Sequence, residues 1–196
     1  MRYVKTNLIL ASHSPRRADI LRQLGLHFTT QASGIDESKV DNSMNPMDFV
    51  MNLALRKAQK VSRFFHEGLV IGADTVVVIE GRILGKPASK AEAIAMLSDL
   101  SGKEHSVFTG LALLEVSSAR KLVSVVETKV QFRSLDKIEI ENYVATGEPL
   151  DKAGAYGIQG KGAILVEKID GCYYNVVGLP VAKLVTMLKE FGVSIG

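Results

Sequence analysis

Hydroxyl and guanidinium side chains gather within the first 25 residues of the chain. An apolar run is followed there by a polar turn and then by apolar residues at the spacing of one helical face. Ser14 stands at the position of a helix N-cap and Pro15 at the first helical position, which defines the start of the helix. Ser12, Arg16 and Arg17 would lie at the positive end of this helix, where backbone N–H groups and cations bind phosphate.

A simpler interpretation of this segment is that Ser14 and Pro15 only cap the helix, while both arginines are solvated on its first turn. Cations at a helix N-terminus are disfavoured by roughly 0.3–1 kcal/mol each. Two adjacent arginines there indicate that something negative compensates them. The segment therefore favours an anion site.

A carboxylate stands in the middle of the most hydrophobic stretch, Leu69–Ile79. A buried ionised carboxylate is costly unless it is paired, hydrogen-bonded or bound to a metal. Gly72 permits a kink in the strand or a close approach of another backbone at this point. We expect the strand to open into a polar site at Asp74 and Thr75. The alternative is that Asp74 is a structural hydrogen-bond acceptor at a bulge.

Other charged residues are also poorly explained by local structure. Asp36 and Glu37 lie in a polar loop, Lys57 lies close to the apolar face of a helix expected over residues 46–65, and Lys86 lies between Gly85 and Pro87. Carboxylate oxygens suit Mg²⁺ or Mn²⁺, and cationic side chains neutralise a polyphosphate. For Lys57 the alternative is a stem laid along the core with its charge in water.

Composition excludes several classes of protein. The chain has 196 residues, 46% of them hydrophobic and 23% charged, with a net charge of +3 and a single cysteine, Cys172. These values predict one globular domain over residues 1–196 and exclude an intramolecular disulfide. There is no basic run typical of nucleic-acid binding and no apolar stretch near the roughly 20 residues of a membrane span. We expect a soluble, cytoplasmic protein that binds neither nucleic acid nor membrane.

Hydrophobic periodicity and turn residues predict alternating strands and helices. The expected strands cover residues 8–11, 26–32, 69–79, 82–84, 107–116, 121–132, 163–169 and 173–177, the last two forming a hairpin around Asp170-Gly171. The expected helices cover residues 15–24, 46–65, 90–100, 136–146 and 180–192. The segment 150–162 is a glycine-rich loop, which by itself is a weak sign of a ligand site. There is no P-loop sequence and no Gly-x-Ser-x-Gly motif.

Four motifs in order resemble the Maf family of nucleoside triphosphate pyrophosphatases. They are Ser12-x-Ser14-Pro15-Arg16-Arg17, Ile71-Gly-Ala-Asp74-Thr75, Gly85-Lys86-Pro87 and Asp151-Lys152-Ala-Gly-Ala-Tyr-Gly-Ile-Gln159-Gly160. The resemblance runs from about Leu8 to Leu188. It implies a mixed α/β fold similar to inosine triphosphate pyrophosphatases, with an elongated sheet, flanking helices and two lobes around a central cleft. It also implies a homodimer.

The resemblance also implies roles for individual residues. Asp74 corresponds to the proton acceptor and, with Glu37, to a ligand of a divalent metal, Mg²⁺ or Mn²⁺. The residues that correspond to substrate-binding positions are Ser12, Ser14, Arg16, Arg17, Lys57, Thr75, Lys86, Lys152 and Gln159. Among them Arg16, Thr75 and Gln159 match the branch of the family that acts on dTTP and UTP.

The implied reaction is hydrolysis between the α and β phosphates of a nucleoside triphosphate, with pyrimidine nucleotides or their modified forms as substrates. The alternative is a nucleotide-binding regulator of cell division that does not turn its ligand over. Asp74 distinguishes the two, because a pure sensor does not need a carboxylate that activates water.

Overall fold

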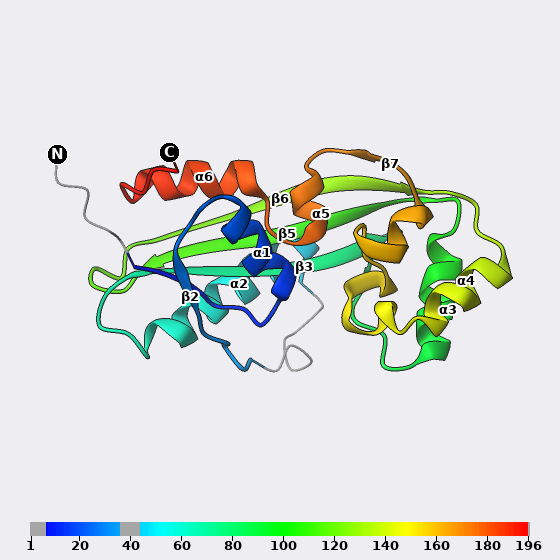
Figure 1. The fold of residues 1–196 in the computed structure, drawn as a ribbon, viewed down its shortest axis with the longest axis horizontal. Coiled ribbons are helices and arrows are strands. Elements are labelled where there is room, and N and C mark those ends of the chain that lie inside the picture. The colour runs from blue at the N-terminus through cyan, green and yellow to red at the C-terminus, as the bar shows by residue number, and fades with distance from the viewer. Residues whose placement is uncertain (1–6, 36–43, 196) are drawn as a thin grey trace. The chain divides into compact units, whose positions relative to one another are not determined.

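The computed structural model describes residues 7–35 and 44–195 of the chain, and Figure 1 shows its fold. The strands are β1 (Leu8–Leu10), β2 (Phe28–Thr30), β3 (Leu69–Ile79), β4 (Arg82–Leu84), β5 (Glu104–Glu115), β6 (Lys121–Phe132) and β7 (Val166–Asp170). The α-helices are α1 (Pro15–Gln23), α2 (Pro46–Ser62), α3 (Lys90–Leu100), α4 (Lys137–Ala145), α5 (Tyr173–Val177) and α6 (Val181–Glu190). Three 3₁₀ helices, η2 (Glu148–Asp151), η3 (Ala153–Ala155) and η4 (Gly160–Leu165), follow α4.

The fold class is mixed α/β, as predicted. Hydrogen-bonded strands follow the order β2-β1-β3-β5-β6-β7, and β4 is added to β3. The chain divides into two compact units: the first holds residues 1–74, 109–126 and 178–196, and the second holds 75–108 and 127–177. The long strands β3, β5 and β6 each contribute residues to both units. The prediction of a single domain over the whole chain stays a prediction.

The first unit is built on parallel strands. β1 pairs in parallel with β2 on one side and with the first residues of β3 on the other. The apolar face of α2 packs on this part of the sheet, in a core that includes Ile9, Ala54, Ala58, Val70 and Ala112. The small side chains at this contact let the helix backbone lie close to the strands.

Local capping contacts define the start of α2 and the end of α1. The side chain of Asn45 accepts a hydrogen bond from the backbone N–H of Met47 and so caps α2. Gly25 has a φ of 69° after the end of α1. Its N–H donates to Arg22 O and that of Leu26 donates to Leu21 O, the bond pattern of a Schellman motif.

The second unit surrounds the other halves of the long strands. β4 pairs with β3 and β7 pairs with β6, both antiparallel. α3 and α4 lie side by side (Figure 1) and pack on a core that includes Val77, Leu97, Val130 and Phe132. The predicted bounds of β3, β4, α3 and β6 agree with the structure, and β2 is shorter than predicted.

One predicted hairpin is wrong. Residues 163–165 belong to η4 and Tyr173–Val177 forms α5, so only the first strand of the hairpin exists, as β7. Asn175 explains the difference, because its side chain donates to Val107 O and to Thr128 Oγ1. A strand at residues 173–177 would lose these buried bonds. Ile138 has the helical spacing of the buried residues of α4, Ile140, Tyr143 and Val144, but it is 68% exposed.

His105 is buried in the core of the second unit. Its Nε2 lies 2.7 Å from the hydroxyl of Tyr156, and its ring meets those of Phe132 and Tyr156 edge-to-face. Burial lowers the pKa of His105 to about 4. A histidine in the unfolded chain binds a proton already below about pH 6.5. Between about pH 6.5 and pH 4 the imidazole is therefore neutral in the folded state and protonated in the unfolded state.

We expect the lowered pKa of His105 to reduce the free energy of unfolding by about 3 kcal/mol between pH 6.5 and pH 4, since the unfolded state takes up the proton first. Urea unfolding at a series of pH values measures it. His105→Gln, which keeps a hydrogen-bonding group but does not titrate, should reduce the pH dependence. His66→Gln, at an exposed histidine, is the control. Equal pH dependence in wild type and His105→Gln would contradict the assignment.

Candidate active site

A buried ion pair joins Lys57 of α2 to Asp74 of β3. Lys57 Nζ lies 2.6 Å from Asp74 Oδ1, and each side chain is 8% exposed. Of the two interpretations of Lys57, the one with its charge in water is therefore wrong. A carboxylate inside an apolar strand is tolerated here because a cation lies directly beside it. Asp74 is the last residue of the first unit along β3.

Gly72 explains how α2 brings Lys57 so close to the strand. A Cβ at Gly72 would lie 2.1 Å from the carbonyl oxygen of Ala54 and 3.1 Å from Ala58 Cβ. Only glycine permits this approach of the helix backbone. The prediction that Gly72 marks a close backbone contact is confirmed.

The polar turn after β1 is organised around the hydroxyl of Ser12. It accepts hydrogen bonds from the backbone N–H of Ser14, at 3.1 Å, and from Arg17 Nη1, at 3.3 Å. Ser14 occupies the N-cap position of α1 with extended backbone angles, but its side chain makes no cap hydrogen bond. The first turn of α1 also contains no acidic residue. The prediction that this helix start, which includes the half-buried Arg16, binds an anion stays a prediction.

The polar turn and Asp74 both come after the stretch in which β1 and β3 pair in parallel. Leu10 is opposite Ile71, and the N–H of Ala11 donates to Ile71 O. Ser12 lies two residues after Leu10, in the turn beyond β1, and Asp74 lies three residues after Ile71, within β3. Ligands of parallel α/β sheets commonly bind beyond the carboxyl ends of the strands. In the first unit, the turn that joins Ser12 to Arg17 and the Asp74 partner of Lys57 therefore both follow the paired residues of β1 and β3.

Sequence reasoning missed Gly178. Its carbonyl oxygen accepts a hydrogen bond of 2.7 Å from Arg17 Nε, across 161 residues of chain. Its φ of 112° is one that other residues rarely adopt. The only sequence signal was the Gly-Leu-Pro turn before α6, which indicates a chain reversal but not its partner.

The second unit holds the remaining described candidates. Thr75 is half-buried on β3, and Lys86 is exposed in the loop after β4. The N–H of Gly154 donates to Gly85 O, so the loop of Lys86 lies beside the segment that carries Lys152. Lys152 Nζ donates to Glu148 O at 2.6 Å and to Asp151 Oδ1 at 2.7 Å. Two of the predicted substrate-binding lysines thus lie on neighbouring segments.

Gln159 is exposed at the start of η4, in the glycine-rich loop. Glu148 and Tyr143 lie beneath this loop. Burial raises the pKa of the Tyr143 phenol. Burial alone would raise the pKa of Glu148 too, but hydrogen bonds from Tyr143 and from two backbone N–H groups outweigh it and hold this pKa below its ordinary value.

Glu37, the second predicted metal ligand, and Asp36 lie outside the described residues. Across residues 7–35 and 44–195, no group of three or more histidine, cysteine, aspartate or glutamate side chains could hold a metal ion. In the same part of the chain, no helix is both long enough and apolar enough to cross a membrane.

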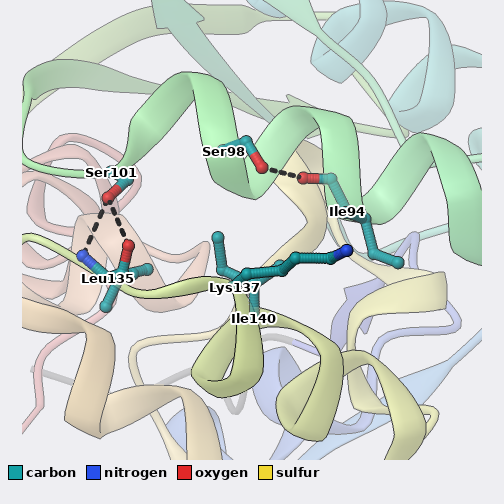
Figure 2. A pocket seen from close by; sticks show the side chains of 6 residues that line it. All are labelled: Ile94, Ser98, Ser101, Leu135, Lys137 and Ile140. Atoms are coloured by element: carbon teal, nitrogen blue, oxygen red, sulfur yellow. Dashed lines mark hydrogen bonds between the residues drawn. The ribbon is translucent and has the colours of Figure 1, made fainter.

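A hollow of about 200 Å³ lies between α3 and α4 and contains none of the predicted site residues (Figure 2). Its serine hydroxyls are used within the protein. Ser98 donates to Ile94 O, and Ser101 donates to Leu135 O and accepts from Leu135 N. The first bond lies within α3, and the other two join its C-terminal end to the segment just before α4, so we interpret the hollow as a packing feature.

Comparison with known proteins identifies the family. Residues 7–191 match the family described as Maf-like protein. The chain belongs to the Maf family. A Maf relative from Pelotomaculum thermopropionicum, named dTTP/UTP pyrophosphatase, is 50% identical over 188 residues, which cover 96% of this chain and 98% of that protein. One of the same name from Moorella thermoacetica is 53% identical over 190 residues, 97% of each chain.

Among solved structures, this Maf chain is similar to a HAM1 protein from Coxiella burnetii. The sequence identity is 17%, the TM-score is 0.49, and the match covers 94% of this chain and 99% of that one.

Proposed function

We propose that this protein hydrolyses nucleoside triphosphates to nucleoside monophosphates and pyrophosphate, with dTTP and UTP as preferred substrates. Relatives about half identical over nearly the full length are named dTTP/UTP pyrophosphatases. The structural observation that carries the proposal is the buried Lys57–Asp74 pair, which, like the Ser12–Arg17 turn, follows the parallel pairing of β1 and β3. The pair provides a proton acceptor, Asp74, and the pair and the turn together provide cationic groups for a phosphate.

In the proposed mechanism Asp74 accepts a proton from the attacking water as the bond between the α and β phosphates breaks. Lys57 Nζ, 2.6 Å from Asp74 Oδ1, fixes the orientation of the carboxylate. Ser12, Ser14, Arg17 and the N-terminus of α1 bind phosphate oxygens. Their donors stabilise the negative charge that develops during cleavage.

In the second unit, we assign Lys86 and Lys152 to phosphate and Thr75 and Gln159 to the base. Arg16, on the first turn of α1, is assigned to nucleotide preference rather than to cleavage. The match of Arg16, Thr75 and Gln159 to the dTTP/UTP branch supports the assignments of these three residues. The loop contact between Gly154 and Gly85 supports a shared role for the two lysines.

A divalent cation is compatible with the described residues. Mg²⁺ is commonly bound through one or two carboxylates together with substrate phosphates and waters, and Asp74 offers one carboxylate. Glu37 is the proposed second ligand. Such an ion would neutralise phosphate charge and lower the pKa of a bound water. The homodimer implied by the family resemblance and the cytoplasmic location indicated by the lone cysteine remain proposals.

The test is release of pyrophosphate from a panel of canonical and modified nucleoside triphosphates, with Mg²⁺ or Mn²⁺. We expect the highest kcat/KM for dTTP and UTP, and nucleoside monophosphate as the second product. Binding of nucleotides without release of pyrophosphate from any of them would instead support a regulator without turnover.

A further inference from the structure

The glycine-rich loop after η3 is wrapped around a single carboxylate, that of Glu148. Glu148 Oε1 accepts hydrogen bonds from the hydroxyl of Tyr143, at 3.0 Å, and from the N–H of Gly162, at 3.1 Å. Its Oε2 accepts from the N–H of Lys161, at 3.2 Å. The three donors come from α4 and from η4, which begins directly after Gln159.

The glycines of this loop fit closely around the same groups. Gly160 has a φ of 68°, and a Cβ there would lie 3.0 Å from Glu148 Oε2. A Cβ at Gly162 would lie 2.2 Å from Gly157 O and 2.6 Å from the hydroxyl of Tyr143. That hydroxyl also accepts a hydrogen bond from the N–H of Gly157. The glycines thus serve to fold the loop tightly over Glu148 and Tyr143.

We propose that Glu148 is a positioning residue for nucleotide selectivity, which holds Gln159 in place through the N–H groups of Lys161 and Gly162. This proposal rests on the proposed function, since it takes Gln159 as a residue that reads the base. Glu148 itself touches no substrate. Its ionised carboxylate supplies the acceptors that orient the backbone next to Gln159, and the backbone orients the side chain.

Glu148→Gln tests the proposal with little change in shape. An amide has one acceptor oxygen in place of two and presents N–H donors to the backbone N–H groups, so part of the network must break. We expect KM for the preferred nucleotide to rise about tenfold and its preference over purine nucleotides to fall by a similar factor. The kcat should change less than twofold, because Asp74 and Lys57 are untouched.

Two further variants separate positioning from a structural effect. In a Gln159→Ala background, Glu148→Gln should cause no additional loss of selectivity, since both changes act through the same side chain. Glu139→Gln is the matched control, because Glu139 also accepts backbone and side-chain hydrogen bonds in this unit, at the start of α4. It should leave selectivity unchanged. Additive effects of Glu148→Gln and Gln159→Ala, or an equal loss of kcat on all nucleotides, would overturn the proposal.

Amide hydrogen exchange provides a readout that does not require turnover. In Glu148→Gln the amides of Lys161 and Gly162 should exchange at least tenfold faster than in the wild type, with α3 unaffected. Unchanged exchange would refute the anchoring role even if the enzyme is active. If these amides exchange faster in the variant but the wild-type protein releases no pyrophosphate, the proposed function fails. Glu148 then only holds the glycine-rich loop in place, without a role in selectivity.

Discussion

Replacing Asp74 with asparagine lowers the kcat for pyrophosphate release by about 10²–10⁴-fold, the range expected when a general base is lost. The amide retains an oxygen that can accept the hydrogen bond from Lys57, but it cannot take a proton from water. Nucleotide binding should be largely retained, because the turn of Ser12 and Arg17 is unchanged. Steady-state kinetics and calorimetric titration with a nucleotide measure the two effects separately.

Stability is the necessary control for this variant. Asp74→Asn removes the charge that Lys57 faces in a buried environment, and removal of one partner of a buried pair costs about 3–5 kcal/mol. Activity should therefore be measured at a temperature where circular dichroism shows the variant to be folded. Asp99→Asn breaks an exposed pair with Arg82 and should change neither stability nor kcat appreciably. A folded Asp74→Asn with near wild-type kcat would exclude Asp74 as the proton acceptor.

Replacing Gly72 with alanine destabilises the protein by about 3 kcal/mol or more, at the upper end of what overpacking costs. The new Cβ would lie 2.1 Å from the carbonyl oxygen of Ala54, which is backbone in the middle of α2 and cannot rotate away. The helix must shift, and Lys57 shifts with it. We expect a lower urea midpoint together with reduced activity in the fraction that remains folded.

Gly85→Ala is the matched control for Gly72→Ala. A Cβ at Gly85 meets no atom within 4 Å, and its backbone does not require glycine. Its free energy of unfolding should stay within about 0.5 kcal/mol of the wild-type value. Similar unfolding midpoints for the two variants would show that the contact between α2 and β3 is not as close as described.

Elements marked by local chemistry were predictable from the sequence. Asn45-Pro46 begins α2, the Gly25 turn ends α1, and Leu69–Ile79 is a strand with the predicted bounds. In each case the signal lies within a few residues: a cap, a left-handed glycine or a continuous apolar run. The same holds for Asp74, because a carboxylate inside an apolar strand is anomalous wherever the strand lies.

Elements that depend on distant partners were not predictable. Tyr173–Val177 has the composition of a strand, but Asn175 bonds to Val107 and Thr128 on β5 and β6, and the segment is helical. Ile138 has helical spacing but lies on the exposed side of α4. Local pattern gives the period of an element, whereas packing decides which side is buried.

For the candidate site too, some features could be predicted from the sequence and others depended on the folded structure. The sequence by itself determined which residues carry unusual chemistry, Asp74 and the arginines after Ser12, because their types conflict with their local surroundings. Only the tertiary structure decided that Lys57 neutralises Asp74 and that the carbonyl of Gly178 holds Arg17. The reason is physical: ion pairs and hydrogen bonds form between groups that the folded chain brings within about 3 Å, and sequence separation carries no record of that distance.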